Sequence, residues 1–82
     1  MLKKSQVLEI LDNGGMVTWS TFSNFAFVWS GPEHERCYFV GFYPLRFAKA
    51  LSASGKFHVQ TTPVVRDGYL VYCTKLYKGE GD

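Results

Sequence analysis

The dipeptide Asp67-Gly68 is the feature that most constrains how this chain can fold. It stands between two runs of strand-forming residues, Val64-Val65-Arg66 and Tyr69-Leu70-Val71. An Asp-Gly pair in this setting is a strong signal for a two-residue hairpin turn, because both positions tolerate positive φ. Such a turn pairs Arg66 with Tyr69 and fixes the register of every pair further out. We therefore predict a C-terminal β-hairpin.

That register predicts the two faces of the hairpin, because side chains alternate along a strand. We expect a core face made of Phe57, Val59, Thr61, Val65, Leu70, Tyr72, Thr74 and Leu76. The opposite face would carry Lys56, His58, Gln60, Arg66, Tyr69, Lys75 and Tyr77, with Val64, Val71 and Cys73 among them. Pro63 cannot donate to a ladder, so its strand should be an edge strand or contain a bulge.

Two helices are predicted upstream of the hairpin. In the first, the spacing of Val7, Leu8, Ile10 and Leu11 gives one buried face. We expect Ser5 to be its N-cap, the helix to begin after Lys3 and Lys4, and Gly14-Gly15 to end it. The second should begin at Pro44 and end at Gly55. In it Phe47, Ala48 and Leu51 point one way, and Arg46, Lys49 and Ala53 point another.

Between the helices the sequence predicts an antiparallel meander, with strands at 16–22, 25–30 and about 36–42. Turns are expected at Ser23-Asn24 and in the polar stretch 31–35. Both faces are apolar: one would carry Phe25, Phe27, Trp29 and Phe39, and the other Trp19, Val28, Tyr38 and Val40. Either helices cover both sides, or one face meets a partner, and a homodimer is one such arrangement.

The predicted fold class is therefore α+β: a single domain over residues 1–82, with a frayed tail at 78–82. Its order is an N-terminal helix, a three-stranded antiparallel meander, a second helix and a C-terminal β-hairpin. This order resembles a winged-helix module, in which the second helix would enter a nucleic-acid groove and the hairpin would be the wing. The stretch Arg36-Cys37-Tyr38-Phe39-Val40-Gly41-Phe42 also resembles the RNP1 strand of RNA-recognition motifs, although Cys37 stands where that strand has glycine.

The sequence offers little for catalysis or for holding a metal. The chain has the two cysteines and two histidines that a Cys2His2 zinc site requires: His34, Cys37, His58 and Cys73. Only His34 and Cys37 are closely spaced, however, whereas such sites have close pairs in both halves. No nucleophile, base and orienting group can be recognised together. We expect a protein that is not an enzyme and that has no cofactor, with a zinc-dependent module as a remote alternative.

Composition limits the kinds of partner and the cellular location that we expect. The chain has 9 basic and 7 acidic residues, a balance that permits a nucleic-acid partner without demanding one. Its two cysteines are far apart, and the N-terminus lacks the apolar run of a signal peptide, so we expect a cytoplasmic protein with no membrane association.

We expect a small binding or regulatory protein that acts by occupying a macromolecular partner. In the preferred version the partner is nucleic acid, touched by Arg46, Lys49, Lys56, Arg66 and Lys75, with Tyr69 and Tyr77 as stacking residues. In the alternative it is a protein-binding inhibitor or adaptor, of the kind carried by phages, that uses aromatic residues exposed on the sheet. The association with phages is an analogy based only on the small size of the chain and its lack of catalytic residues, and no motif supports it.

Overall fold

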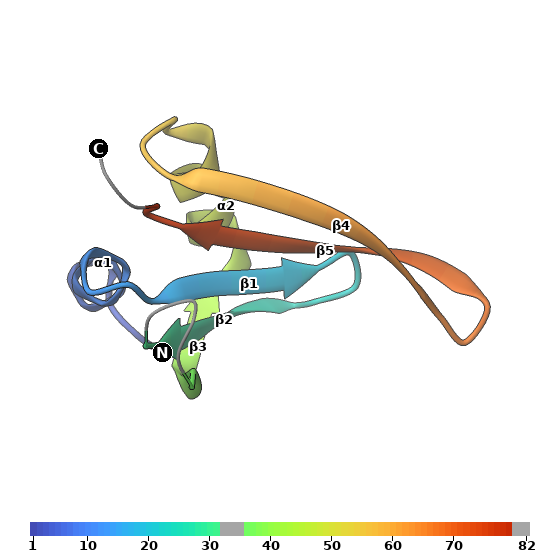
Figure 1. Cartoon of the computed structure of the whole chain (residues 1–82), viewed down its shortest axis with the longest axis horizontal. Helices are drawn as coiled ribbons and strands as arrows, with labels where there is room; N and C mark the ends of the chain where they lie inside the picture. The colour runs from blue at the N-terminus through green and yellow to red at the C-terminus, as the bar shows by residue number, and fades with distance from the viewer. Residues whose placement is uncertain (32–35, 80–82) are drawn as a thin grey trace.

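The computed structural model describes residues 1–31 and 36–79. In this part of the chain the elements are α1 (Lys4–Asp12), β1 (Met16–Ser20), β2 (Phe25–Ser30), β3 (Tyr38–Pro44), α2 (Leu45–Ala53), β4 (His58–Arg66) and β5 (Tyr69–Tyr77). The strands form one antiparallel sheet in the order β3-β2-β1-β5-β4 (Figure 1). The predicted α+β class and the order of its elements are confirmed. The polar turn at Glu33-His34-Glu35 and the end of the tail lie outside the described residues.

The first helix begins earlier than the sequence predicts. Lys4 is its first residue and Lys3 its N-cap, so Ser5 lies within the first turn and is not the cap. The side chain of Gln6 reaches back to the cap residue, where its Oε1 accepts a hydrogen bond from the Lys3 backbone N–H at 2.8 Å. The end of the helix is as predicted: Gly14 follows Asn13 with φ of 90°.

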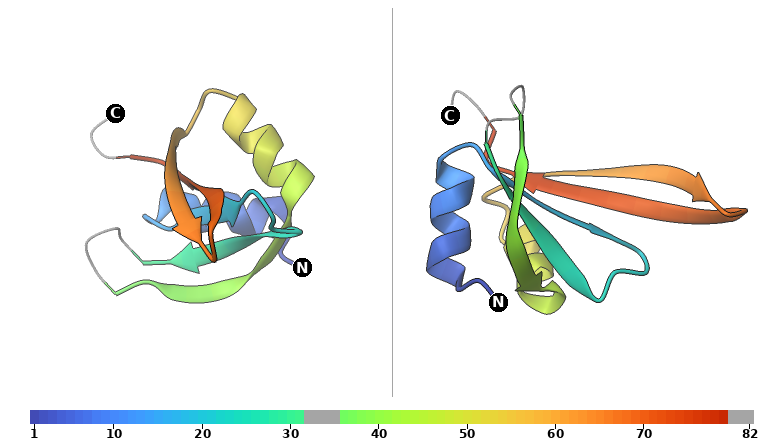
Figure 2. Two further views of the ribbon diagram at one scale, coloured as in Figure 1. Left: turned by 90° about the vertical axis from the view of Figure 1, so that its right-hand side faces the viewer. Right: turned by 90° about the horizontal axis from the view of Figure 1, so that it is seen from below.

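The core lies between the two helices and one face of the sheet. Its fully buried members come from both helices and from three strands: Val7 and Leu11 of α1, Ala48 of α2, and Val17, Ala26, Val28 and Leu76 of the sheet. Trp19, Tyr43 and Leu51 complete it. On the strands these residues all fall on one side by the ladder register, since Val17 pairs with both Val28 and Leu76. Both helices therefore cover the same face, and the sheet twists strongly around them (Figure 2).

The second helix is amphipathic as expected, with one correction. Ala48 and Leu51 are buried, whereas Phe47 is 45% exposed and contacts Tyr43 at a ring centroid distance of 5.9 Å. Pro44 is the N-cap of α2, since the helix begins at Leu45. Gly55, with φ of 76°, follows its C-cap and ends it.

The hairpin has the predicted register. Arg66 pairs with Tyr69, and Asp67 and Gly68 both have positive φ, of 51° and 81°. The strand that contains Pro63, β4, is an edge strand, as its missing N–H requires.

The expectation that one whole face of the hairpin is core was wrong. Leu76 is buried and Phe57 packs partly against the core. Further out, Val59 is 45%, Tyr72 47%, Leu70 53% and Val65 71% exposed. The reason is the length of β1, which pairs only with Cys73 to Tyr77, so the outer half of the hairpin extends past the rest of the sheet (Figure 1).

The hairpin is not a separate wing. Because β5 pairs with β1, the hairpin continues the sheet of the meander. The segment before α2 consists of strands, where a winged helix would have a helix. The fold thus has the element order of a winged-helix module but not its spatial arrangement. The positions of α2 and of the hairpin therefore have to be considered separately.

Candidate functional site: the open face of the sheet

The face of the sheet opposite the helices is the candidate site, and we call it the open face. Each strand contributes the residues that alternate with the core positions. In ladder order they include Phe39 and Phe42 of β3, Phe25, Phe27 and Trp29 of β2, Met16 and Thr18 of β1, Lys75 and Tyr77 of β5, and His58 and Gln60 of β4. No helix among the described residues packs on this side.

The β2 and β3 end of the open face is an aromatic cluster, made of Phe25, Phe27, Trp29, Phe39 and Phe42. Its rings touch in tilted or edge-on pairs, with centroid distances from 5.1 Å for Phe39 and Phe42 to 6.1 Å for Phe27 and Phe39. Phe25, Phe39 and Phe42 are 42%, 44% and 43% exposed. A contiguous patch of this kind on the surface of a soluble protein usually marks an interaction site.

A side-chain hydrogen bond and the packing of the rings fix the position of the cluster. The indole Nε1 of Trp29 donates a hydrogen bond to Thr18 Oγ1 at 2.9 Å, which fixes the ring against the neighbouring strand. Edge-to-face packing places the positive edge of one ring against the negative face of the next, and it adds about 0.5–1.5 kcal/mol per pair. The rings are therefore an ordered surface that needs little rearrangement to meet a partner.

A smaller group lies on the β5 and β4 side of the open face. Tyr77 stacks on His58, with ring centroids 5.4 Å apart and an interplanar angle of 18°. The Lys75 Nζ lies 4.9 Å from the centre of the same Tyr77 ring. Tyr77 is thus already in contact with two neighbours, so it is less available for base stacking than the sequence suggests.

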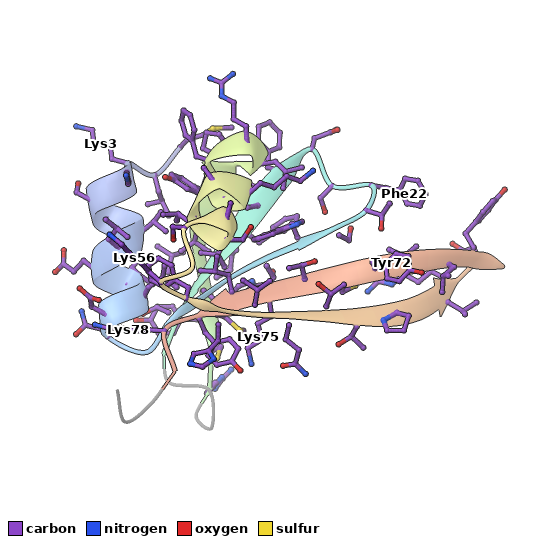
Figure 3. The ribbon with its side chains drawn as sticks, turned by 90° about the horizontal axis from the view of Figure 1, so that it is seen from above. Lys3, Phe22, Lys56, Tyr72, Lys75 and Lys78 are labelled. Atoms are coloured by element: carbon purple, nitrogen blue, oxygen red, sulfur yellow. The ribbon has the colours of Figure 1, made fainter. Side chains whose placement is uncertain are left out.

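The structure separates the residues predicted to bind a partner. Arg66, Tyr69, Lys75 and Tyr77 share the open side of the hairpin by register. Arg46 and Lys49 lie on α2, which covers the other face of the sheet. Lys56 lies in the connection before β4. In Figure 3, Lys56 and Lys75 come from different segments of the chain, the connection before β4 and the strand β5. One continuous basic surface does not form.

Two of the cations have close neighbours of their own. The Arg46 guanidinium carbon lies 4.9 Å from the centre of the adjacent Phe47 ring. Lys78 Nζ contacts Asp12 Oδ1 at 2.8 Å, which ties the end of β5 to the end of α1. Both are surface contacts, and contacts of this kind add little to stability.

The structure offers no metal cluster in the part that it describes. Within residues 1–31 and 36–79, no three His, Cys, Asp or Glu side chains come together. Cys37 and Cys73 form no disulfide and are both partly buried. The remaining member of the hypothetical zinc site, His34, lies outside the described residues.

Phe42 is the site residue that the sequence analysis missed. Strict alternation would separate it from Phe39, but the ladder slips by one residue where Val28 pairs with Gly41 and Trp29 with Phe39. Val40 is the extra residue of this bulge, and both phenylalanines reach the open face. Val40 and Tyr38, expected beside Trp19 and Val28, are instead 39% and 63% exposed. The glycine within an otherwise apolar strand was the available signal.

Comparisons with known proteins add no function. No protein-family model, no curated protein and no solved structure matches this chain. Among the described residues, neither helix is long and apolar enough to cross a membrane. The functional argument therefore rests on the geometry of the open face.

Proposed function

We propose that this chain is a small non-enzymatic binding protein that occupies a protein partner through its aromatic cluster. One observation carries the proposal: three phenylalanine rings on an uncovered sheet face, Phe25, Phe39 and Phe42, are each more than two-fifths exposed and belong to one packed cluster. Aromatic anchors grouped at the centre of a patch are typical of interface hot spots. A protein of this kind regulates or inhibits its partner by covering a surface that the partner needs.

The distribution of charge supports a protein over a nucleic acid. Affinity for nucleic acid comes largely from cations that neutralise neighbouring phosphates along one surface. Here Arg46 and Lys49 lie on the helix side, while Lys75 lies against Tyr77 on the open side. Among the described residues, the two strands that carry the aromatic cluster, β2 and β3, contain no cation. Rings surrounded by few charges suit an apolar partner surface better than a phosphate backbone.

Matched phenylalanine variants test the proposal. Phe47 is 45% exposed, nearly the same as Phe39 and Phe42, but it lies on α2. We expect tagged parent protein and a Phe47→Ser variant to capture the same partner from an extract of the source cells. A Phe39→Ser/Phe42→Ser variant should lose it, even at about 0.5 M salt, where screening removes charge-driven contacts. Equal capture by all three proteins would contradict the proposal.

Single-stranded nucleic acid is the second candidate, and one observation favours it. The open side of the hairpin carries two cations by register, Arg66 and Lys75. Bases could stack on the exposed rings, with the two cations near the backbone. In this version Tyr69 and Tyr77 would extend the stacking surface toward the end of the hairpin.

Salt dependence separates the two candidates. Binding of labelled single- and double-stranded oligonucleotides would be followed by fluorescence anisotropy at about 50 and 200 mM salt. The protein-partner proposal predicts no binding at either concentration. Binding that weakens steeply with salt, and that is lost in an Arg66→Glu/Lys75→Glu variant but kept in Arg46→Glu/Lys49→Glu, would make the second candidate the function.

A second copy of the chain is a further partner that the same surface could bind. Sedimentation of the purified protein over a range of concentrations tests this directly. A monomer–dimer equilibrium that the Phe39→Ser/Phe42→Ser variant abolishes would identify the partner as another molecule of this protein. A monomer at all concentrations would leave the open face for a different protein.

A further inference from the structure

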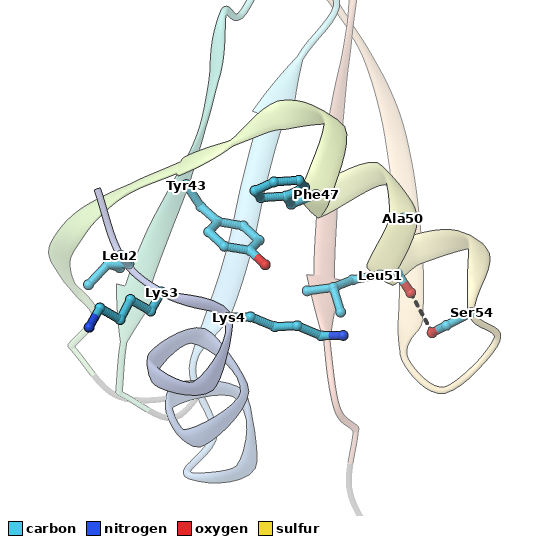
Figure 4. Close-up of a pocket in the computed structure, with 8 residues that line it drawn as sticks. All are labelled: Leu2, Lys3, Lys4, Tyr43, Phe47, Ala50, Leu51 and Ser54. Atoms are coloured by element: carbon cyan, nitrogen blue, oxygen red, sulfur yellow. Dashed lines mark hydrogen bonds between the residues drawn. The ribbon is translucent and has the colours of Figure 1, made fainter.

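A pocket on the helix side of the molecule is separate from the open face. It has a volume of about 680 Å³ and lies between the N-terminal end of α1 and the face of α2 (Figure 4). Its lining residues are Leu2, Lys3, Lys4, Tyr43, Phe47, Ala50, Leu51 and Ser54. This volume is in the range of pockets that bind small molecules, which are mostly apolar with a few placed polar groups.

The N-terminal segment forms one wall because it is tied to β3. The Leu2 backbone N–H donates to the Phe42 carbonyl at 3.0 Å. Gly41 permits this approach, since a Cβ there would lie only 3.3 Å from Leu2 Cγ. The wall is thus part of the folded structure, and it carries Lys3 and Lys4 to the edge of the pocket.

Tyr43 contributes a hydroxyl group to the pocket. The residue is only 2% exposed, yet its hydroxyl points from the core into the pocket, toward Lys4 (Figure 4). In the described part of the chain no side chain or backbone group forms a hydrogen bond with that hydroxyl. Burial raises the pKa of the Tyr43 phenol, so the hydroxyl keeps its proton at neutral pH and can donate it. Among the described residues no buried side-chain polar atom lacks a hydrogen-bond partner, so this unpartnered hydroxyl is open to the pocket, where a bound acceptor would take its hydrogen bond.

The other polar residues of the pocket lining indicate that a ligand would carry negative charge. Ser54 is not available as a donor, because its hydroxyl already bonds to the Leu51 carbonyl at 2.6 Å. Lys4 extends across the opening toward Leu51 (Figure 4). Lys3 and Lys4 are the charged residues of the lining, and the first turn of α1 contains no acidic residue that would neutralise them. The positive end of the helix dipole adds to the same field.

From this geometry we infer that the pocket binds a small amphipathic carboxylate. Its head would accept a hydrogen bond from the Tyr43 hydroxyl and pair with Lys4, and its hydrocarbon part would lie on Leu2, Phe47, Ala50 and Leu51. The apolar lining alone would accept any hydrocarbon. The phenol and the lysine select an anionic acceptor, and the lysine disfavours a cationic head group.

Three ligands with the same hydrocarbon chain test the inference: octanoate, 1-octanol and octyltrimethylammonium. Each would be titrated into isotopically labelled protein and followed by amide chemical shifts. We expect octanoate to shift the amides of Leu2, Tyr43 and Leu51 and to bind about tenfold more tightly than 1-octanol, because a charged acceptor strengthens the hydrogen bond. Octyltrimethylammonium should bind most weakly. Equal affinity for octanoate and 1-octanol, or shifts confined to the open face, would overturn the inference.

Two substitutions assign the roles of the polar groups. Tyr43→Phe keeps the buried ring and should weaken octanoate about tenfold and 1-octanol much less, because the alcohol oxygen is the weaker acceptor. Lys4→Gln changes an exposed side chain that the fold does not need, and should weaken octanoate about two- to fivefold. Lys49→Gln, on α2 but outside the pocket lining, is the matched control and should bind as the parent does. Parent-like binding of octanoate by both Tyr43→Phe and Lys4→Gln would refute the carboxylate site.

Discussion

The two faces of the sheet both carry large apolar side chains, but one face is buried and the other is exposed. On the helix side Val17, Val28 and Leu76 are fully buried beneath α1 and α2. On the open side Phe25, Phe39 and Phe42 remain more than two-fifths exposed. Two helices of 9 residues each are enough to cover one face at the centre of the sheet, but not both. The apolar face that they leave is therefore the one available to a partner.

The same contrast exists along the hairpin. Near the helices Leu76 is part of the core, whereas Leu70, on the same side of the same strand, is 53% exposed. Alternation places both on one face, but only the helices decide which of them is buried. This difference teaches that side-chain periodicity determines orientation, and that burial depends on where other elements reach.

Truncating the two leucines should give the largest contrast in stability. Leu76→Ala removes a fully buried side chain and should lower the free energy of unfolding by about 2–5 kcal/mol. Leu70→Ala, on the exposed part of the same face, should cost less than about 1 kcal/mol. Urea unfolding followed by tryptophan fluorescence measures both. Similar losses for the two variants would mean that the outer hairpin is also packed.

Replacing the turn glycine should give the next largest effect. Gly68 has φ of 81°, so Gly68→Ala forces a residue with a Cβ into the left-handed region, at a cost of about 1–2 kcal/mol. Asp67→Asn is the control, because asparagine readily adopts positive φ and should leave the unfolding midpoint nearly unchanged. If Gly68→Ala is as stable as the parent, the outer hairpin does not depend on this turn.

Alkaline pH should destabilise the helix side through Tyr43. Its pKa is raised in the folded protein, so above about pH 10 the unfolded chain loses this proton while the folded chain keeps it. The free energy of unfolding should therefore fall as the pH rises through this range. Thermal unfolding between pH 8 and pH 11 should show a smaller fall for Tyr43→Phe than for the parent. Identical falls would place the phenol in solvent.

Breaking the ion pair between Lys78 and Asp12 should give the smallest effect. The two side chains are 54% and 60% exposed, and solvent screens such pairs, so Lys78→Ala should cost about 0.2–1 kcal/mol at most. The loss should shrink further in about 0.5 M salt. A larger, salt-independent loss would show that the end of β5 contributes more to the helix side than its contacts suggest.

Local sequence signals predicted the elements well, and long-range packing explains where they failed. Asp67-Gly68 determined a turn and its register because the two residues alone favour positive φ. The Val40 bulge depends on pairing with a strand distant in sequence, and it moved Phe42 onto the open face. No pattern within α2 could show that Arg46 and Lys49 lie across the sheet from Lys75.

The pocket was beyond sequence reasoning for a related reason. Leu2 and Tyr43 are far apart in the chain and meet only because the N-terminal segment bonds to β3. A glycine within an apolar strand is a signal for an irregular ladder, but it does not show that Leu2 approaches Gly41 closely. Residues that meet only through tertiary contacts have no regular spacing in the sequence from which their proximity could be predicted.

Hydroxyl-radical footprinting of the free protein and of its captured complex tests the central claim most directly, because oxidation of each phenylalanine reports its exposure. The account predicts that Phe25, Phe39 and Phe42 are oxidised in the free protein and protected in the complex, while Phe47 is oxidised equally in both. Protection of Phe47 with continued oxidation of Phe39 and Phe42 would contradict it, since the partner would then be bound on the helix side.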